Sequence, residues 1–138
     1  MLLAVRLTDV RMNRYVLTLN LKNDPAAIEA YRRHHASVWP EVVDSLRHAG
    51  VRHMDIHLLG RQLVMVVELD DGLEVTRVFA AHRASNARVA EWEALMKTLQ
   101  EPVAGAPPGE WWAVMEPVFH LNTDQPVGVH TSERPRQS

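Results

Sequence analysis

Residues 53–69 have the sequence HMDIHLLGRQLVMVVEL. Apolar and polar side chains alternate over residues 53–58, which is the pattern of a strand with one buried face. Residues 63–69 are almost entirely apolar and predict a second strand. Because residues 60–62 leave room only for a short turn, we expect the two strands to pair as an antiparallel hairpin.

The second strand of this hairpin is apolar on both of its faces. Leu63, Met65 and Val67 point to one side of the sheet, and Val64 and Val66 point to the other. An antiparallel sheet with helices on one side only has a solvated second face, where polar residues are the rule. We therefore expect a second copy of the chain to cover that face, and we predict a homodimer.

The chain before the hairpin predicts a strand and two helical pieces. Residues 14–21 alternate apolar and polar side chains, as a strand does. The Asp-Pro pair at 24–25 is typical of a helix start. That helix should run to Val38, since Pro40 disfavours helical geometry in the residue before it. Pro40 begins the second piece, and Gly50 is a suitable left-handed stop.

The chain after the hairpin predicts a short helix around 73–81, a clear helix at 87–99 and a last strand at 111–121. The order of elements is then strand, helix, strand, strand, helix, strand. This βαββαβ order is the ferredoxin-like pattern of an α+β fold, in which an antiparallel sheet carries its helices on one face.

Composition limits the kind of protein and its partners. The 138 residues, 46% hydrophobic and 23% charged, indicate one ordinary globular domain. A net charge of −2 with scattered arginines argues against nucleic acid. The chain has no cysteine, which excludes disulfides, zinc ribbons and thiol catalysis. No apolar run is long enough for a membrane span, and Arg6 and Asp9 interrupt any signal-peptide core, so we expect a cytoplasmic protein.

Three segments are expected along the chain. Residues 1–11 form a flexible N-terminal extension, with Met12 as an alternative start. Residues 12–122 form the single folded domain. Residues 123–138 are polar and contain proline, which is typical of a disordered tail.

Two proton-carrying side chains lie on one face of the first predicted helix. Tyr31 and His35 are four residues apart, so one stands above the other, with Ile28 and Val38 on the same apolar stripe. A histidine in such a place is more often a satisfied core residue. Here the combination with a phenol indicates a lined pocket, in which His35 can act as an acid or a base near neutral pH.

Aromatic residues indicate what the pocket binds. Trp39 and Trp92 offer flat apolar faces, on which the C–H surface of a sugar ring lies well, although Trp92 fits a core stripe equally well. Trp111 and Trp112 are adjacent on a predicted strand, so at most one of them should line the pocket. No glycine-rich phosphate loop is present. The remaining histidines lack suitably spaced carboxylates, and we predict no metal.

The sequence resembles a known family from about residue 14 to residue 121. The motifs that carry the resemblance are Tyr31-x-x-x-His35, Val38-Trp39-Pro40-Glu41, Leu46-x-x-Ala49-Gly50 and Glu116-Pro-Val-Phe-His-Leu121, which are similar to the signature and the last strand of the L-rhamnose mutarotase family. The resemblance implies a ferredoxin-like dimeric α/β barrel. It also implies interconversion of the α and β anomers of a 6-deoxy-L-hexose without metal or cofactor.

The resemblance assigns roles to individual residues. His35 matches the family's proton-donating histidine, and Tyr31 matches its sugar-binding tyrosine. Trp92 matches the first of two adjacent tryptophans that contact the sugar. The second of these is Glu93 here, and a sugar-binding tyrosine at the start of the second strand is Met54.

The identity of the sugar stays open between L-rhamnose and L-fucose. The two departures remove two of the family's sugar contacts, and the segment Gly109-Glu-Trp-Trp112 resembles the branch associated with L-fucose catabolism. Mutarotation also needs a base to complement the acid. Glu68 and Glu116 are the candidates, because both are expected to point from strands toward the pocket.

Two other kinds of protein remain as alternatives. Cofactor-independent monooxygenases of the dimeric α/β barrel type share the fold, but they act on flat aromatic substrates and need a wholly apolar cavity. A sugar-binding module without turnover is the second alternative, since fold alone does not define function.

Overall fold

The computed structural model describes residues 13–122. The expectations for the N-terminal extension, the start at Met12 and the C-terminal tail lie outside these residues. The elements of the described part are β2 (Asn13–Leu21), α2 (Pro25–His35), α3 (Pro40–Ala49), β3 (Val51–Leu59), β4 (Gln62–Leu69), α4 (Val75–Arg83), α5 (Ala87–Lys97), β5 (Gln100–Glu101) and β6 (Ala113–Val114).

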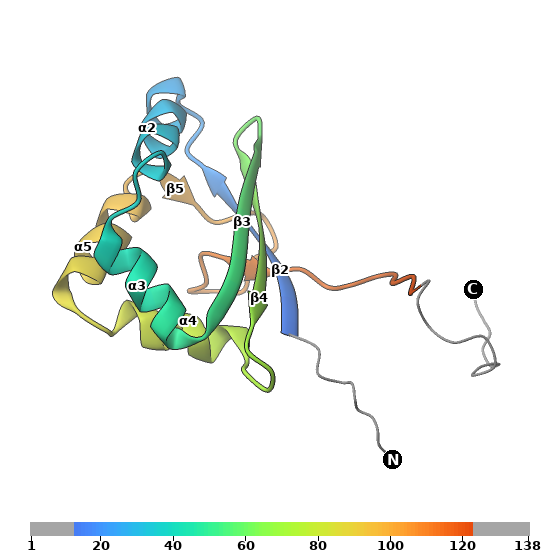
Figure 1. Ribbon diagram of the computed structural model, residues 1–138. Helices are drawn as coiled ribbons and strands as arrows, with labels where there is room; N and C mark the ends of the chain where they lie inside the picture. The colour runs from blue at the N-terminus through green and yellow to red at the C-terminus, as the bar shows by residue number, and fades with distance from the viewer. Residues whose placement is uncertain (1–12, 123–138) are drawn as a thin grey trace, which may run out of the picture.

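The strands form one antiparallel sheet in the order β3-β4-β2-β5, and β6 also pairs with β2. The helix pairs α2–α3 and α4–α5 connect β2 to β3 and β4 to β5, and they lie on the same side of the sheet (Figure 1). This confirms the ferredoxin-like βαββαβ pattern. None of the helices in residues 13–122 is long and apolar enough to cross a membrane.

The inner face of the sheet is continuous across three strands. Leu17 on β2 pairs with Met65 on β4, and Met65 pairs with Ile56 on β3. Because side chains alternate along a strand, Leu19 and Leu63 lie on the same face, where both are fully buried. The helices cover this face, and the functional pocket lies between the two layers.

The outer face of the sheet is also partly apolar, as predicted. Val16 of β2 pairs with Val66 of β4, and Val64 lies opposite Thr18. The three valines are partly buried, and no helix of the described chain covers them (Figure 1). Charged residues border this patch, among them Arg14 and Glu68.

The first helix is shorter than predicted. It begins as expected, with Asp24 accepting a hydrogen bond from Ala26 N, but it ends at His35 rather than at Val38. Ala36 N donates to both Arg32 O and Arg33 O, which tightens the last turn. The chain then turns before Pro40 begins α3. His35 therefore occupies the last turn of α2 and not its interior.

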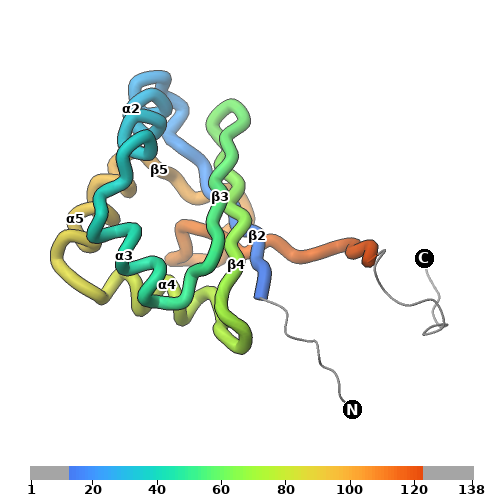
Figure 2. Tube along the Cα trace, viewed as in Figure 1, coloured from blue at the N-terminus to red at the C-terminus, as the bar shows by residue number. Residues whose placement is uncertain are grey.

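The last predicted strand, residues 111–121, was wrong in extent. Of these residues, only Ala113 and Val114 pair with β2 in the described chain. At the other end of this edge of β2, beside residues 20–21, β5 takes the place that residues 111–112 would otherwise have. Met115 N still donates to Val16 O, and beyond it residues 116–122 lead away from the sheet as an extended arm (Figures 1 and 2). Val118 and Phe119 are 92% and 81% exposed on this arm.

Candidate active site

A pocket of about 310 Å³ lies between the helices and the inner face of the sheet. This volume is at the lower end of the range of about 300–1,000 Å³ that is usual for small-molecule sites. Its lining includes aliphatic side chains from both layers, Leu17 and Met65 from the sheet and Val42 and Leu46 from α3. It also includes aromatic and ionisable side chains, among them Tyr31, His35, His82, Trp92 and Glu93. The pocket therefore combines apolar surface with groups fit for proton transfer.

The imidazole of His35 is held from three directions. Its Nδ1 lies 2.9 Å from the carbonyl oxygen of Tyr31, one turn earlier in α2. Its ring stacks on the phenol of Tyr31 with 4.0 Å between centroids, and it meets the Trp92 ring edge-on at 5.4 Å. A carbonyl oxygen only accepts hydrogen bonds, so Nδ1 carries the proton. In the neutral ring, Nε2 then keeps its lone pair.

The protonation state of His35 follows from its surroundings. Burial lowers its pKa below the usual value, the hydrogen bond to Tyr31 opposes this, and the neighbouring His34 adds to the lowering. The net result favours the neutral ring near pH 7. The resting imidazole therefore presents a proton acceptor. After taking a proton it becomes the acid that was predicted from the sequence.

Tyr31 supplies a permanent hydrogen-bond donor. Its side chain is only 4% exposed, and burial, assisted by the nearby Glu93, raises the pKa of its phenol. The hydroxyl group thus keeps its proton at all physiological pH values. Tyr31 lines the pocket together with His35, as the helical spacing predicted.

The two candidate tryptophans have different places. Trp92 is buried and lines the pocket. Trp39 is not among the lining residues; it meets Trp92 edge-on at 5.1 Å, and the Arg88 guanidinium lies 3.8 Å from the centroid of its ring. The prediction that Trp39 contacts the substrate is therefore not supported by its position. Its ring supports Trp92 from outside the pocket.

Met54 and Glu93 both line the pocket. Met54 comes from the inner face of β3, where it pairs with Val67. Glu93 follows Trp92 on α5, and 32% of its side chain is exposed. Burial raises the pKa of Glu93, although the positive charges of Arg83 and Lys97 oppose the shift.

The two carboxylates predicted as bases lie outside the pocket, so the expectation that they point toward it was wrong. Glu68 follows Val67, whose side chain is on the inner face, and therefore points to the outer face. There its Oε2 lies 3.1 Å from Nη2 of Arg14, its cross-strand partner on β2. Glu116 follows the end of β6 and is exposed.

Sequence reasoning missed His82, a buried residue of α4 that lines the pocket. A signal was present, because Val75, Val78 and His82 share one helical stripe. Trp111 and Trp112 both line the pocket, against the expectation that at most one would. The alternation rule failed for them because they precede β6 and do not belong to a strand.

No group of three His, Cys, Asp or Glu side chains within residues 13–122 is placed to hold a metal ion. The pocket is lined instead by the ionisable side chains of His35, His82, Glu93, Glu110, Arg83 and Lys97, with Tyr31 as a neutral donor. A small α+β domain with such a pocket between its helices and its sheet has the groups that acid–base catalysis requires.

Comparisons with known proteins agree with an enzyme of this kind. The family model for L-rhamnose mutarotase matches residues 14–121. An L-fucose mutarotase from Xanthomonas campestris pv. campestris is 37% identical over 80% of this chain and 90% of its own. An L-rhamnose mutarotase from Paraburkholderia xenovorans is 34% identical over 72% of this chain and 89% of its own. The chain therefore belongs to the L-rhamnose mutarotase family, whose members are isomerases.

A solved structure of an L-rhamnose mutarotase has a similar fold. The L-rhamnose mutarotase FA22100 from Formosa agariphila superposes with a TM-score of 0.58, covering 80% of this chain and 99% of its own. The two sequences are 19% identical, so this likeness concerns the fold alone.

Proposed function

We propose that the protein interconverts the α and β anomers of a 6-deoxy-L-hexose, either L-rhamnose or L-fucose. The observation that carries the proposal is the fixed tautomer of His35, which keeps a lone pair on Nε2 and lines a sugar-sized pocket between Tyr31 and Trp92. The family membership supports the same reaction.

The chemistry requires only proton exchange. Ring opening moves a proton from the anomeric hydroxyl to the ring oxygen while the C1–O5 bond breaks, and an aldehyde forms. The aldehyde group then rotates and the ring closes on its other face. A positioned acid or base accelerates such a step by about 10²–10⁴-fold. His35 is the group that exchanges the proton in this proposal, and the Tyr31 hydroxyl orients the sugar.

The pocket has a suitable surface for each part of a 6-deoxy sugar. The aliphatic lining residues, such as Leu17, Val42 and Met65, suit the methyl group at C6. The face of Trp92 matches the C–H side of the ring, and Met54 and Glu93 complete the proposed contacts. The L-fucose mutarotase from Xanthomonas, 37% identical, supports L-fucose as the sugar to test beside L-rhamnose.

The monooxygenase and the non-catalytic sugar-binding module make different predictions about the pocket and about anomer exchange. A monooxygenase for flat aromatic substrates needs a wholly apolar cavity, whereas this pocket contains Tyr31, His35, His82 and Glu93. A sugar-binding module without turnover predicts binding of the sugar while anomer exchange stays at the rate of the buffer. The mutarotase is therefore the better supported function.

A homodimer is part of the same proposal. The outer sheet face carries Val16, Val64 and Val66 without a covering helix in the described chain. The extended arm adds exposed apolar residues, Val118, Phe119 and Leu121. Apolar area of this kind is expected to bind a partner, and a second copy supplies the same surface in return.

The test is anomer exchange measured by saturation-transfer proton NMR, with L-rhamnose and L-fucose side by side. We expect exchange above the buffer rate for at least one of the sugars, and the faster sugar is the preferred substrate. Exchange at the buffer rate for both, with sugar binding retained, would support the non-catalytic module instead.

A further inference from the structure

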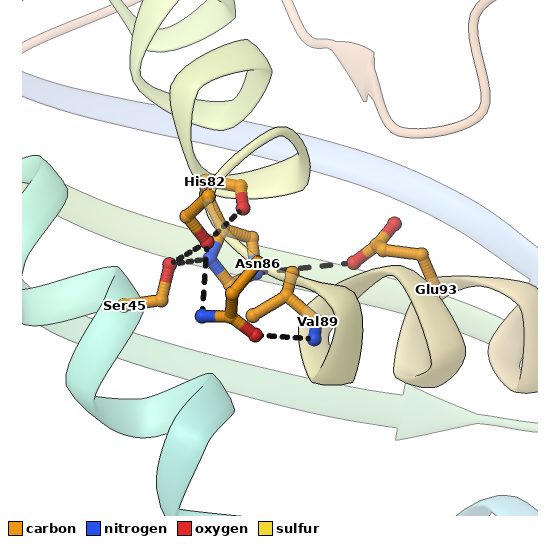
Figure 3. Close-up of polar contacts among 6 residues, drawn as sticks. Ser45, His82, Asn86, Val89 and Glu93 are labelled. Atoms are coloured by element: carbon orange, nitrogen blue, oxygen red, sulfur yellow. Dashed lines mark hydrogen bonds and ion pairs between the residues drawn. The ribbon is translucent and has the colours of Figure 1, made fainter.

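A hydrogen-bonded network behind the pocket wall joins three helices. The Oγ of Ser45 on α3 lies 2.8 Å from His82 Nδ1 on α4, and also 2.8 Å from Ser85 Oγ. Ser85 Oγ donates to the carbonyl oxygen of His82 at 2.7 Å. On the other side of its ring, His82 Nε2 lies 3.9 Å from Glu93 Oε2 on α5. Figure 3 shows Ser45, His82 and Glu93 in this succession.

One assignment of protons satisfies all three short contacts. The carbonyl oxygen of His82 can only accept, so the hydroxyl group of Ser85 donates its hydrogen bond to this oxygen. Ser45 must then donate to Ser85 Oγ. With its proton used in this way, Ser45 can only accept from His82, and Nδ1 of His82 therefore carries a proton.

In this tautomer Nε2 of His82 carries a lone pair, and it lies 3.9 Å from the carboxyl group of Glu93. Burial and the charge of Arg83 lower the pKa of His82, and burial raises the pKa of Glu93. A lone pair and a carboxylate repel each other, and at 3.9 Å no hydrogen bond joins the two groups. The lone pair of His82 Nε2 and the burial of Glu93 therefore both favour the protonated carboxyl of Glu93 over its carboxylate.

A proton on Glu93 is available to the pocket, because Glu93 lines it. Glu93 also lies close enough to Tyr31, the residue on which His35 stacks, for ionisation of the carboxyl to raise the pKa of the phenol. Arg83 and Lys97 are the cations that act on Glu93. The pocket thus contains His35 as a proton acceptor and Glu93 as a proton donor.

We propose that Glu93 is the second catalytic group of the site, that the lone pair of His82 Nε2 disfavours the ionised form of Glu93, and that Ser45 and Ser85 fix the tautomer of His82. The proposal rests on the proposed mutarotase function. Glu93 gives its proton to the ring oxygen as the C1–O5 bond breaks. At the same time His35 Nε2 takes the proton of the anomeric hydroxyl as the C1=O bond forms.

Closure of the ring reverses both transfers. After rotation about C1–C2, protonated His35 returns its proton to the aldehyde oxygen while the O5 hydroxyl attacks C1. The O5 proton returns to the Glu93 carboxylate. No proton, electron or atom is gained or lost over the cycle, so no further reactant is required.

A Ser-His-Glu set of this kind does not make Ser45 a nucleophile. Ser45 is 8% exposed and does not line the pocket, and its hydroxyl proton is committed to Ser85. A nucleophilic serine must instead reach the substrate and give its proton to the histidine. Ser45 and His82 therefore act on the reaction through Glu93 and are positioning residues.

The test compares Glu93→Gln with Glu91→Gln in the full-length protein. The glutamine at position 93 keeps the shape of the side chain but has no proton to exchange. Glu91 is on the same helix, pairs with Arg88 and does not line the pocket. We expect Glu93→Gln to lower kcat for anomer exchange by about 10²-fold with little change in KM, and Glu91→Gln to leave both unchanged.

Two further measurements separate catalysis from structure. Addition of formate or acetate should restore part of the rate in Glu93→Ala, and Ser45→Ala should shift the pH profile of kcat. A Glu93→Gln variant with the wild-type kcat would overturn the proposal while the mutarotase function stands.

A direct measurement of the tautomer does not depend on activity. Nitrogen-15 NMR of the His82 ring should show a protonated Nδ1, with His82 and Glu93 titrating as a coupled pair. A neutral ring protonated at Nε2 would overturn the assigned tautomer and, with it, the proposed action of His82 on Glu93. If the wild-type protein accelerates exchange of neither sugar, the mutarotase function is wrong. The NMR measurement still shows whether His82 has the assigned tautomer and titrates together with Glu93.

Discussion

The imidazole of His35 stacks on the phenol of Tyr31 at 4.0 Å, and its Nδ1 lies 2.9 Å from the carbonyl oxygen of that same tyrosine. One residue thus sets both the orientation and the tautomer of the catalytic candidate. The stacked ring limits rotation of the imidazole, and the carbonyl oxygen requires the proton to be at Nδ1. The spacing of four residues in the last turn of α2 makes both contacts possible.

Replacement of His35 tests its role in proton exchange. We expect His35→Ala to lower enzymatic anomer exchange by about 10²–10⁴-fold, since the variant has no proton acceptor at that place. Urea unfolding should remain cooperative, because His35 is only partly buried at the end of a helix. The exposed His48 provides the matched control, and His48→Ala should keep the wild-type rate. Retained exchange in His35→Ala would remove this histidine from the mechanism.

Trp92 requires a milder substitution than alanine. It is 5% exposed and contacts both His35 and Trp39, so Trp92→Ala should cost about 3–5 kcal/mol of stability. Trp92→Phe keeps an aromatic ring in the core but shortens the proposed sugar platform. We expect it to raise the Kd or KM for the sugar more than it lowers kcat.

Trp39→Phe is the comparison for that experiment, because Trp39 lies behind Trp92 and outside the pocket. Its effect on sugar affinity should be smaller. If Trp92→Phe and the wild-type protein bind the sugar with equal affinity, the role of Trp92 is purely structural.

The activity should depend on pH through His35. Burial lowers its pKa below 6.5, so the acceptor Nε2 is available at neutral pH and becomes protonated only in more acidic solution. We expect kcat/KM to fall as the pH decreases, with a midpoint below 6.5. A midpoint above that value would contradict the burial of the free imidazole.

Stability should depend on pH in the same range. The pKa values of His35 and His82 are lowered from 6.5 in the folded state, so the unfolded chain binds more protons between the lowered values and 6.5. The stability that these two histidines contribute is therefore fully present above pH 6.5 and is lost as the pH falls through their lowered pKa values. Glu93 acts in the opposite sense, because its pKa is raised from 4.5 and its contribution is lost as the pH rises through the raised value.

Comparison of His82→Gln with His48→Gln by urea unfolding measures the histidine contribution. The free energy of unfolding should depend less steeply on pH in His82→Gln than in wild type, and His48→Gln should match wild type. Identical pH dependence in all three proteins would contradict the lowered pKa of His82.

Much of the fold was predictable because its signals are local. The alternation of Leu17, Leu19 and Leu21 marks a strand with one buried face, and Asp24 marks a helix start, whatever the rest of the chain does. The extent of β6 was not predictable in this way. Residues 115–121 have the composition of a strand, but whether they pair depends on their position relative to the edge of β2. That position is set by tertiary contacts and not by the local sequence.

The same distinction applies to the site. Tyr31 and His35 were predicted from helical spacing and lie together in the pocket. His82 and Glu93 come from different helices, and sequence spacing does not show that α4 and α5 bring them within 3.9 Å. Glu68 was misplaced although its strand was predicted correctly, because a strand that is apolar on both faces does not reveal which face is inward.

Gly50 tests the packing of the corner between α3 and β3. Its φ of +112° is in the left-handed region, and a Cβ at this position would lie 2.3 Å from Leu73 Cδ1. Gly50→Ala should therefore destabilise the protein through both backbone strain, of about 1–3 kcal/mol, and a steric clash. Gly60 has φ +62° but open space around it, so Gly60→Ala should show the strain alone.

Urea unfolding of the two glycine variants gives the comparison directly. We expect Gly50→Ala to lose clearly more stability than Gly60→Ala. Equal losses would mean that Leu73 moves aside without cost.

The outer face of the sheet tests the proposed homodimer. Val66 lies at its centre, paired with Val16 on one side and Asp55 on the other. If two such faces meet, Val66→Glu places a charge in a desolvated interface and should shift sedimentation equilibrium from dimer to monomer. Ala90→Glu, on an exposed position of α5, adds the same charge away from this face and should remain dimeric. A wild-type protein that sediments as a stable monomer would contradict the argument drawn from the doubly apolar strand, and the exposed Val118 and Phe119 would then need another explanation.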